Sequence, residues 1–189
     1  YFGQVYTKWT RFMSPIFFIF PLFAAIYLSR LSTKYLVLST ILCIIPGILF
    51  FSQYFLPNPR VLASNWINNN IPPNSSILSE SGNVTDLKLR PDINIINFDF
   101  YSLDQDYNNK ISLDNLLSKV DYVLIPSRRI FKNQNNPLFP YSQNYYQNIF
   151  SNNYKLIYQS TSSSENAEET FTVFDFPTLR LYQHNAIQK

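Results

Sequence analysis

Two cationic side chains near the start of the chain have the type and spacing to bind a phosphate group. Lys8 and Arg11 lie three residues apart, which places them on one face if the segment is helical, and a long apolar run follows them. Lysine offers a point charge and arginine a planar fork of donors, and both suit a lipid phosphate or pyrophosphate at headgroup depth. In the alternative interpretation, both side chains only anchor the chain at a membrane interface, with Trp9 in the aromatic belt. Lys8 and Arg11 are therefore candidate lipid-phosphate-binding residues, and interfacial anchoring stays open.

A second pair of cations, Arg128 and Arg129, follows an apolar stretch that is typical of a strand ending at Ser127. Ligands of open α/β sheets bind beyond the carboxyl ends of the strands, so these arginines are candidate substrate-domain contacts. A loop after a strand is also a common place for solvent-exposed charge. That second interpretation is the favoured one.

The acidic residues and the histidine do not form a catalytic pattern. Glu168 and Glu169 are adjacent, and neighbouring residues of a strand point to opposite faces, so they cannot converge on one substrate atom. Solvent-exposed or structural roles are expected for them and for Asp175. His184 is the only histidine, and the three glycines could hardly build a phosphate-cradling loop. The sequence therefore predicts no catalytic residue and no metal ligand within the chain.

Overall composition argues against a nucleic-acid partner and excludes an internal disulfide. The formal net charge is +3 and no Lys/Arg-rich run occurs, which argues against a nucleic-acid partner. Cys43 is the only cysteine and lies in an apolar run, so no internal disulfide can form.

The elements that must position these residues begin with two apolar runs, 12–31 and 35–55. No charged residue lies between Phe12 and Leu28 or between Tyr35 and Phe55. The second run has the roughly 20 residues that cross a bilayer, and the first reaches that length when Leu31 and its polar flanks are counted. The turn 29–34 holds Arg30 and Lys34, which the positive-inside rule places in the cytoplasm. Lys8, Arg11 and Arg60 lie on the other side, so charge counting alone is close to a draw. The prediction is a pair of transmembrane helices over 12–56, preceded by an extracytoplasmic segment 1–11. The first residues are not a signal peptide, and we interpret the chain as a C-terminal part of a larger membrane protein.

The remaining residues, 57–189, have the patterns of a small extracytoplasmic α/β domain. A strand, strand, helix, strand order predicts a parallel core, because a helical crossover joins parallel neighbours. The last two strands predict an antiparallel hairpin at the sheet edge. The fold class is thus a membrane helical hairpin followed by a small α/β domain with a mixed sheet. The expected helices are 60–69, one N-capped by Ser112 and reaching Val120, and 143–150; the expected strands are 76–79, 93–100, 121–126, 155–160, 171–175 and 178–182.

Three stretches, in order, resemble a known family. They are Lys8-Trp-Thr-Arg11-Phe12 with Pro15 after it; Asp121-Tyr-Val-Leu-Ile-Pro-Ser-Arg-Arg-Ile-Phe131, followed by Phe139-Pro-Tyr141 and Asn144-Tyr-Tyr-Gln147; and Ala167-Glu-Glu-Thr-Phe-Thr-Val-Phe-Asp-Phe-Pro177. Together they resemble the C-terminal part of bacterial membrane glycosyltransferases of the GT-C class. These are relatives of dolichyl-phosphate-mannose protein mannosyltransferases and of lipid A aminoarabinose transferases. The chain departs from the family pattern at Phe12, usually tyrosine, and at Phe176, often histidine.

The resemblance implies a transferase that takes a sugar from a polyprenyl-phosphate donor at the outer face of the bacterial plasma membrane. In the family, an acidic residue on the first extracytoplasmic loop acts as base or metal ligand, and no residue here matches it. Any divalent metal would therefore be bound by residues outside this chain. The expected partners are membrane lipid, the lipid-linked sugar and upstream transmembrane helices, and this part would shape the donor or acceptor site. The alternative is a membrane-anchored extracytoplasmic binding or scaffold module without catalysis.

Overall fold

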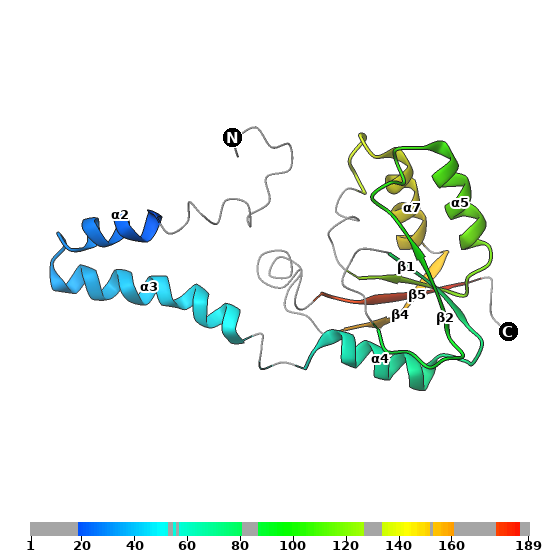
Figure 1. The fold of residues 1–189 in the computed structure, drawn as a ribbon, viewed down its shortest axis with the longest axis horizontal. Helices are drawn as coiled ribbons and strands as arrows, with labels where there is room; N and C mark the ends of the chain where they lie inside the picture. Colours follow the sequence, from blue (N-terminus) through cyan, green and yellow to red (C-terminus); the bar gives the residue numbers. More distant parts are fainter. Residues whose placement is uncertain are drawn as a thin grey trace. The chain divides into compact units, whose positions relative to one another are not determined.

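The structure is a computed structural model that describes residues 19–52, 55, 57–80, 87–126, 134–151, 153–160 and 177–185. The chain divides into two compact units, Tyr1–Phe51 and Ser52–Lys189 (Figure 1). Each unit is described here by itself.

The first unit contains helices α2 (Ile19–Leu28) and α3 (Thr33–Ser52). They are joined by a short turn in which the amides of Arg30 and Leu31 donate to carbonyls near the end of α2. No described side chain of either helix is buried. Large apolar side chains along both helices are exposed, as with Phe23 and Leu42. Surfaces of this kind are characteristic of sites that another apolar surface covers.

The predicted membrane hairpin is wrong. Among the described residues, none of the helices combines the length and the apolar character needed to cross a bilayer. Helix α2 has 10 residues, or about 15 Å, which is half of a hydrocarbon core of roughly 30 Å. Helix α3 has 20 residues, but Lys34 and polar residues lie in its first turn and middle, and Pro46 interrupts its hydrogen bonding. The first predicted span, 12–31, begins outside the described residues.

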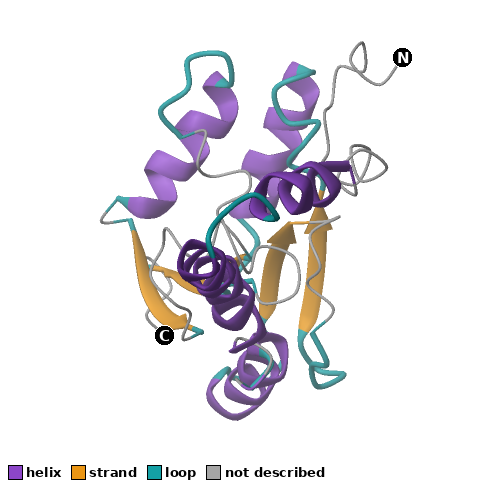
Figure 2. Cartoon of the chain, turned by 90° about the vertical axis from the view of Figure 1, so that its left-hand side faces the viewer, coloured by secondary structure: helices purple, strands orange, loops and turns teal. Residues whose placement is uncertain are grey.

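The second unit contains a five-stranded mixed sheet of strand order β2-β1-β3-β5-β4. Strands β1, β2 and β3 are parallel, while β5 pairs antiparallel with both β3 and β4. The strands are orange in Figure 2. Their bounds are β1 Ser76–Glu80, β2 Asn94–Phe98, β3 Tyr122–Ile125, β4 Tyr154–Gln159 and β5 Arg180–His184.

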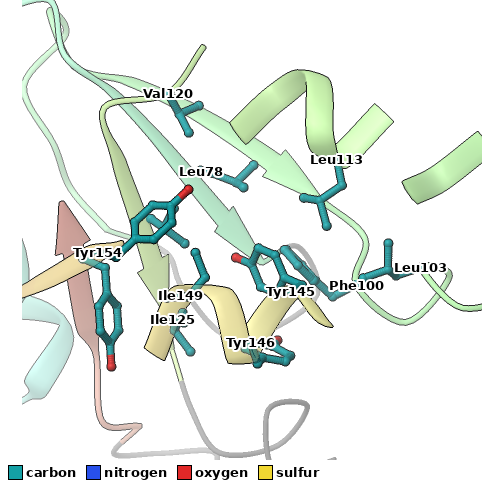
Figure 3. Close-up of a cluster of buried hydrophobic side chains, with 12 residues drawn as sticks. Leu78, Phe100, Leu103, Leu113, Val120, Ile125, Tyr145, Tyr146, Ile149 and Tyr154 are labelled. Carbon is teal, nitrogen blue, oxygen red and sulfur yellow. The ribbon is translucent and has the colours of Figure 1, made fainter. Parts of the chain in front are cut away.

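Helices cover both faces of this sheet (Figure 1). Helices α5 (Tyr107–Leu117) and α7 (Pro140–Phe150) lie on one face, and α4 (Pro59–Asn70) lies on the other. The α5/α7 face carries the aromatic core, where Tyr145, Ile149 and Leu113 gather around Leu78 of β1 (Figure 3). The α4 face is aliphatic, with Ala63, Ile67, Ile77, Ile93, Leu124, Leu179 and Leu181 buried together with Tyr122. Alternate residues of each strand therefore enter opposite cores, as the period of a strand requires.

Local patterns predicted most of these elements, with two corrections. Helix α5 begins at Tyr107 with Asp106 as its N-cap, so the prediction of Ser112 as the cap is wrong. The Asp106 carboxylate accepts from the amide of Asn108 at 3.0 Å, five residues before the apolar positions begin to repeat. Strand β5 is internal to the sheet and β4 is the edge, so the final strand is not an edge strand. Its predicted partner, 171–175, lies outside the described residues.

Candidate functional site at the carboxyl edge of the sheet

The four candidate binding residues of the sequence all lie outside the described residues. These are Lys8 and Arg11 in 1–18, and Arg128 and Arg129 in 127–133. His184 is described, and its ring packs edge-on against Tyr154 of β4, with 4.8 Å between ring centroids. The histidine therefore has a packing role at the end of β5.

A group of buried polar residues lies at the edge of the sheet where the parallel strands end. Its members are Ser79, Glu80, Thr178 and Arg180. The chain leaves β1 toward β2 on one side and leaves β3 toward β4 on the other, so a topological switch point lies between β1 and β3. Open α/β sheets bind ligands in the crevice outside the carboxyl ends of the strands at such a point. Strand β5, which is antiparallel, begins at this same edge.

A buried carboxylate and a buried guanidinium stand in one cross-strand row at this edge. Ser79 pairs with Leu124, so Glu80 stands one step further along, opposite Ile125, and Ile125 pairs with Arg180. Directly opposite residues point to the same face of a sheet, which here is the face covered by α5 and α7. Glu80 is 1% exposed and Arg180 is 5% exposed. At about 4.8 Å per strand, their Cα atoms lie about 10 Å apart, within the combined reach of the two side chains.

Tyr146 of α7 completes the buried polar cluster. Its phenol donates a hydrogen bond to Oε1 of Glu80. Burial raises the pKa of Tyr146 well above its ordinary value, and the negative charge of Glu80 raises it further. The phenol therefore stays protonated and acts as a donor to the carboxylate at neutral pH.

Tyr145, the neighbouring residue on α7, is buried in a different way. Its hydroxyl makes no hydrogen bond in the part of the chain that the structure describes. Burial first, and then the charge of Glu80, raise the pKa of Tyr145 well above its ordinary value. The hydroxyls of Ser79 and Thr178, which are also buried near this edge, likewise lack partners. Unsatisfied buried hydroxyls are rare in folded proteins and often mark functional or strained positions.

The rim of this edge is exposed and aromatic. Tyr101 follows β2, is 48% exposed, and its phenol contributes to raising the pKa of Tyr146. It therefore lies close enough to the buried cluster to act on it electrostatically. In the described ranges, no three residues among His, Cys, Asp and Glu are grouped so that they could hold a metal ion.

We name this group the carboxyl-edge cluster: Glu80, Tyr145, Tyr146 and Arg180, with Tyr101 at its rim. Sequence reasoning missed it, because Glu80 and Tyr146 are 66 residues apart. One signal was available: Arg180 stands between Leu179 and Leu181 in a predicted strand. A charge at that position is expected to face solvent, and here it is only 5% exposed.

Comparisons of this chain with known protein families, curated proteins and solved structures found no match. The family resemblance therefore depends only on the three stretches quoted above. In the second stretch, residues 122–125 form β3, and Oδ2 of Asp121 accepts from both the amide and the hydroxyl of Ser76 at 2.9 Å. Asp121 thus ties the amino ends of β1 and β3 together, which is a structural role.

Proposed function

We propose that the α/β unit is a non-catalytic substrate-binding domain of a glycosyltransferase that uses a polyprenyl-phosphate-linked sugar at the extracytoplasmic face of a membrane. In this proposal the unit shapes the donor or acceptor site at the carboxyl edge of β1 and β3. The catalytic acid, and any metal it requires, come from outside this chain.

The observation that carries the proposal is the burial of Glu80 and Arg180 at the switch point. Burying a carboxylate and a guanidinium costs free energy that a well-packed apolar pair would not cost. Such departures from the simplest folding solution are expected at functional sites. The order of the three family-like stretches supports the choice of a glycosyltransferase.

The chemistry of the cluster fits the two parts of such a substrate. The positive charge of Arg180 gives this edge a preference for a phosphate group. The negative charge of Glu80, which accepts a hydrogen bond from Tyr146, favours ligand groups that donate hydrogen bonds, such as the hydroxyls of a sugar. Because both residues are buried, they act mainly by setting the shape and potential of the edge, while exposed Tyr101 contacts the ligand.

The test is binding of a short-chain prenyl phosphate hexose to the 189-residue chain, measured by isothermal titration calorimetry. We expect Glu80→Gln and Arg180→Gln each to weaken binding at least about tenfold. Asp121→Asn is the matched control, because it alters a carboxylate at the opposite end of the same strands. It should leave the affinity within about twofold. Arg11→Ala is a further arm, since Arg11 remains a predicted phosphate contact.

Two results would reject the proposal. One is that the folded chain fails to bind the prenyl phosphate hexose. The other is that the Glu80 and Arg180 variants bind it as tightly as the parent chain does. Either result would favour the alternative of a binding or scaffold module that has no sugar-transfer partner.

A further inference from the structure

Exposed Tyr107 and half-buried Tyr141 and Lys110 form a compact group where α5 and α7 begin. Tyr107 is the first residue of α5, and Tyr141 is the second residue of α7. Their ring centroids lie 6.3 Å apart, with planes tilted at 57°. The ammonium of Lys110 lies over both rings, 5.7 Å from the centroid of Tyr107 and 5.5 Å from that of Tyr141. We call these three residues the aromatic platform.

Carboxylates hold both helix starts that carry the platform. Asp104 accepts from the amides of Tyr141 and Ser142 at 2.7 and 3.2 Å, and from the Ser142 hydroxyl at 2.5 Å. Asp106 caps α5 by accepting from the amide of Asn108 at 3.0 Å. The two tyrosines are therefore presented by backbone that is already fixed. A fixed surface loses little conformational entropy when a ligand binds.

The platform lies on the ligand side of the domain. Helix α5 follows the carboxyl end of β2 and α7 follows that of β3, so both helices begin at the edge that holds the carboxyl-edge cluster. Tyr107 is 58% exposed, although a tyrosine ring carries a large apolar area. Phe139, which precedes α7, is exposed as well.

We propose that the aromatic platform binds a sugar ring of a glycan; its place in sugar transfer rests on the function proposed above. The C–H face of a pyranose packs flat on an aromatic ring, and this burial favours association in water. Because the Lys110 ammonium already lies over one face of each ring, the sugar stacks on the face of Tyr107 that Lys110 leaves open. The phenol hydroxyls of Tyr107 and Tyr141 donate to the sugar oxygens. Tyr107 supplies the exposed stacking ring, and Lys110 positions it.

The local charge favours a neutral polyhydroxyl ligand over an anionic one. Asp106 and Asp114 lie four residues on either side of Lys110 along α5, so they share its face of the helix. The surface around the platform therefore has no net positive charge with which to attract an anionic lipid headgroup or an acidic peptide. A sugar ring needs aromatic area and paired donors and acceptors, and both are present.

The test is saturation-transfer difference NMR on the 189-residue chain with methyl α-D-mannopyranoside, glucopyranoside and galactopyranoside as separate probes. We expect transfer to the ring C–H protons of one face of at least one sugar. Tyr107→Ala should reduce that transfer at least about fivefold, whereas Tyr107→Phe, which keeps the ring, should retain most of it. Tyr35→Ala is the control, because Tyr35 is an equally exposed tyrosine on α3.

Three results would overturn the inference. They are no transfer with any of the three sugars to a folded chain, equal transfer to Tyr107→Ala and the parent, or an equal loss in Tyr35→Ala. Binding to anionic phospholipid vesicles without sugar binding would assign the platform to a lipid surface and overturn it too. A different combination of results would keep the platform and reject only the proposed function. In it, Tyr107→Ala loses the NMR saturation transfer to the sugar, while Glu80→Gln binds the prenyl phosphate hexose as tightly as the parent chain.

Discussion

Tyr145 and Tyr146 are adjacent on α7, and removing one oxygen from each should change stability in opposite directions. Both rings are buried in the same core. The Tyr146 phenol donates to Glu80, whereas the Tyr145 phenol is buried without a hydrogen-bond partner among the described residues. The substitution Tyr→Phe keeps the ring and its packing at each site. The pair of variants therefore isolates the hydroxyls.

The expected magnitudes follow from these partners. A hydrogen bond to a charged group contributes about 1.5–3 kcal/mol, and its loss leaves a buried carboxylate with one donor fewer, so Tyr146→Phe should destabilise by about 2–3 kcal/mol. A buried hydroxyl without a partner costs about 1–3 kcal/mol. Tyr145→Phe should therefore be neutral or stabilise the chain by about 1 kcal/mol.

The assay is equilibrium urea unfolding at pH 7, followed by circular dichroism and compared at unchanged m value. A double-mutant cycle with Glu80→Gln should give a coupling of at least about 1 kcal/mol for Tyr146. The same cycle should give much less for Tyr145. The reasoning is refuted if Tyr145→Phe is as destabilising as Tyr146→Phe, or if Tyr146→Phe has no effect.

Three further predictions concern the same layer of the structure. Burial first, and then the charge of Glu80, raise the pKa of Tyr146, so above pH 10 the unfolded chain loses this proton before the folded chain does. Stability should therefore fall as the pH rises past 10. In urea titrations the fall between pH 10 and 11 should be smaller in Tyr146→Phe by about 1 kcal/mol, because the tyrosine of the unfolded chain is only half ionised at pH 10. Asp104→Ala should destabilise by about 1–2 kcal/mol in urea, because the first turn of α7 loses its acceptor, and Asp104→Asn should cost less. Ile149→Ala should lower the unfolding free energy by about 2–5 kcal/mol, because Ile149 is fully buried. Leu138→Ala, at an exposed site, should change it by no more than about 0.5 kcal/mol. Equal effects of the two substitutions would contradict the assigned core.

Local sequence pattern was enough to predict the helices and strands whose residues fit only one type of element. Helix α4 begins where Asn58 and Pro59 give an N-cap and a first-turn proline, and its apolar positions repeat with a helical period. Strand β1 and strand β3 are short apolar runs bounded by polar residues. Ser112 failed as a cap because Asp106 stands earlier on a helix-compatible segment, and no pattern in the sequence ranks the two.

The sequence alone determined the apolar character of 19–52, but not what that character builds. Run length predicted membrane helices, whereas within the described residues helix α2 is too short to span a bilayer and α3, which contains Lys34 and Pro46, is not apolar enough over its length. Helix ends depend on the hydrogen bonds actually formed, and apolar composition does not fix them.

Only the tertiary structure placed the polar residues of the carboxyl-edge cluster. Glu80 ends strand β1 and Arg180 stands between Leu179 and Leu181, and the sequence analysis assigned neither residue a role. Their burial arises because α7 packs over the carboxyl ends of β1 and β3, and because β5 is inserted inside the sheet. Strand order and helix placement depend on contacts between residues far apart in the chain, and periodicity within one element carries no information about them.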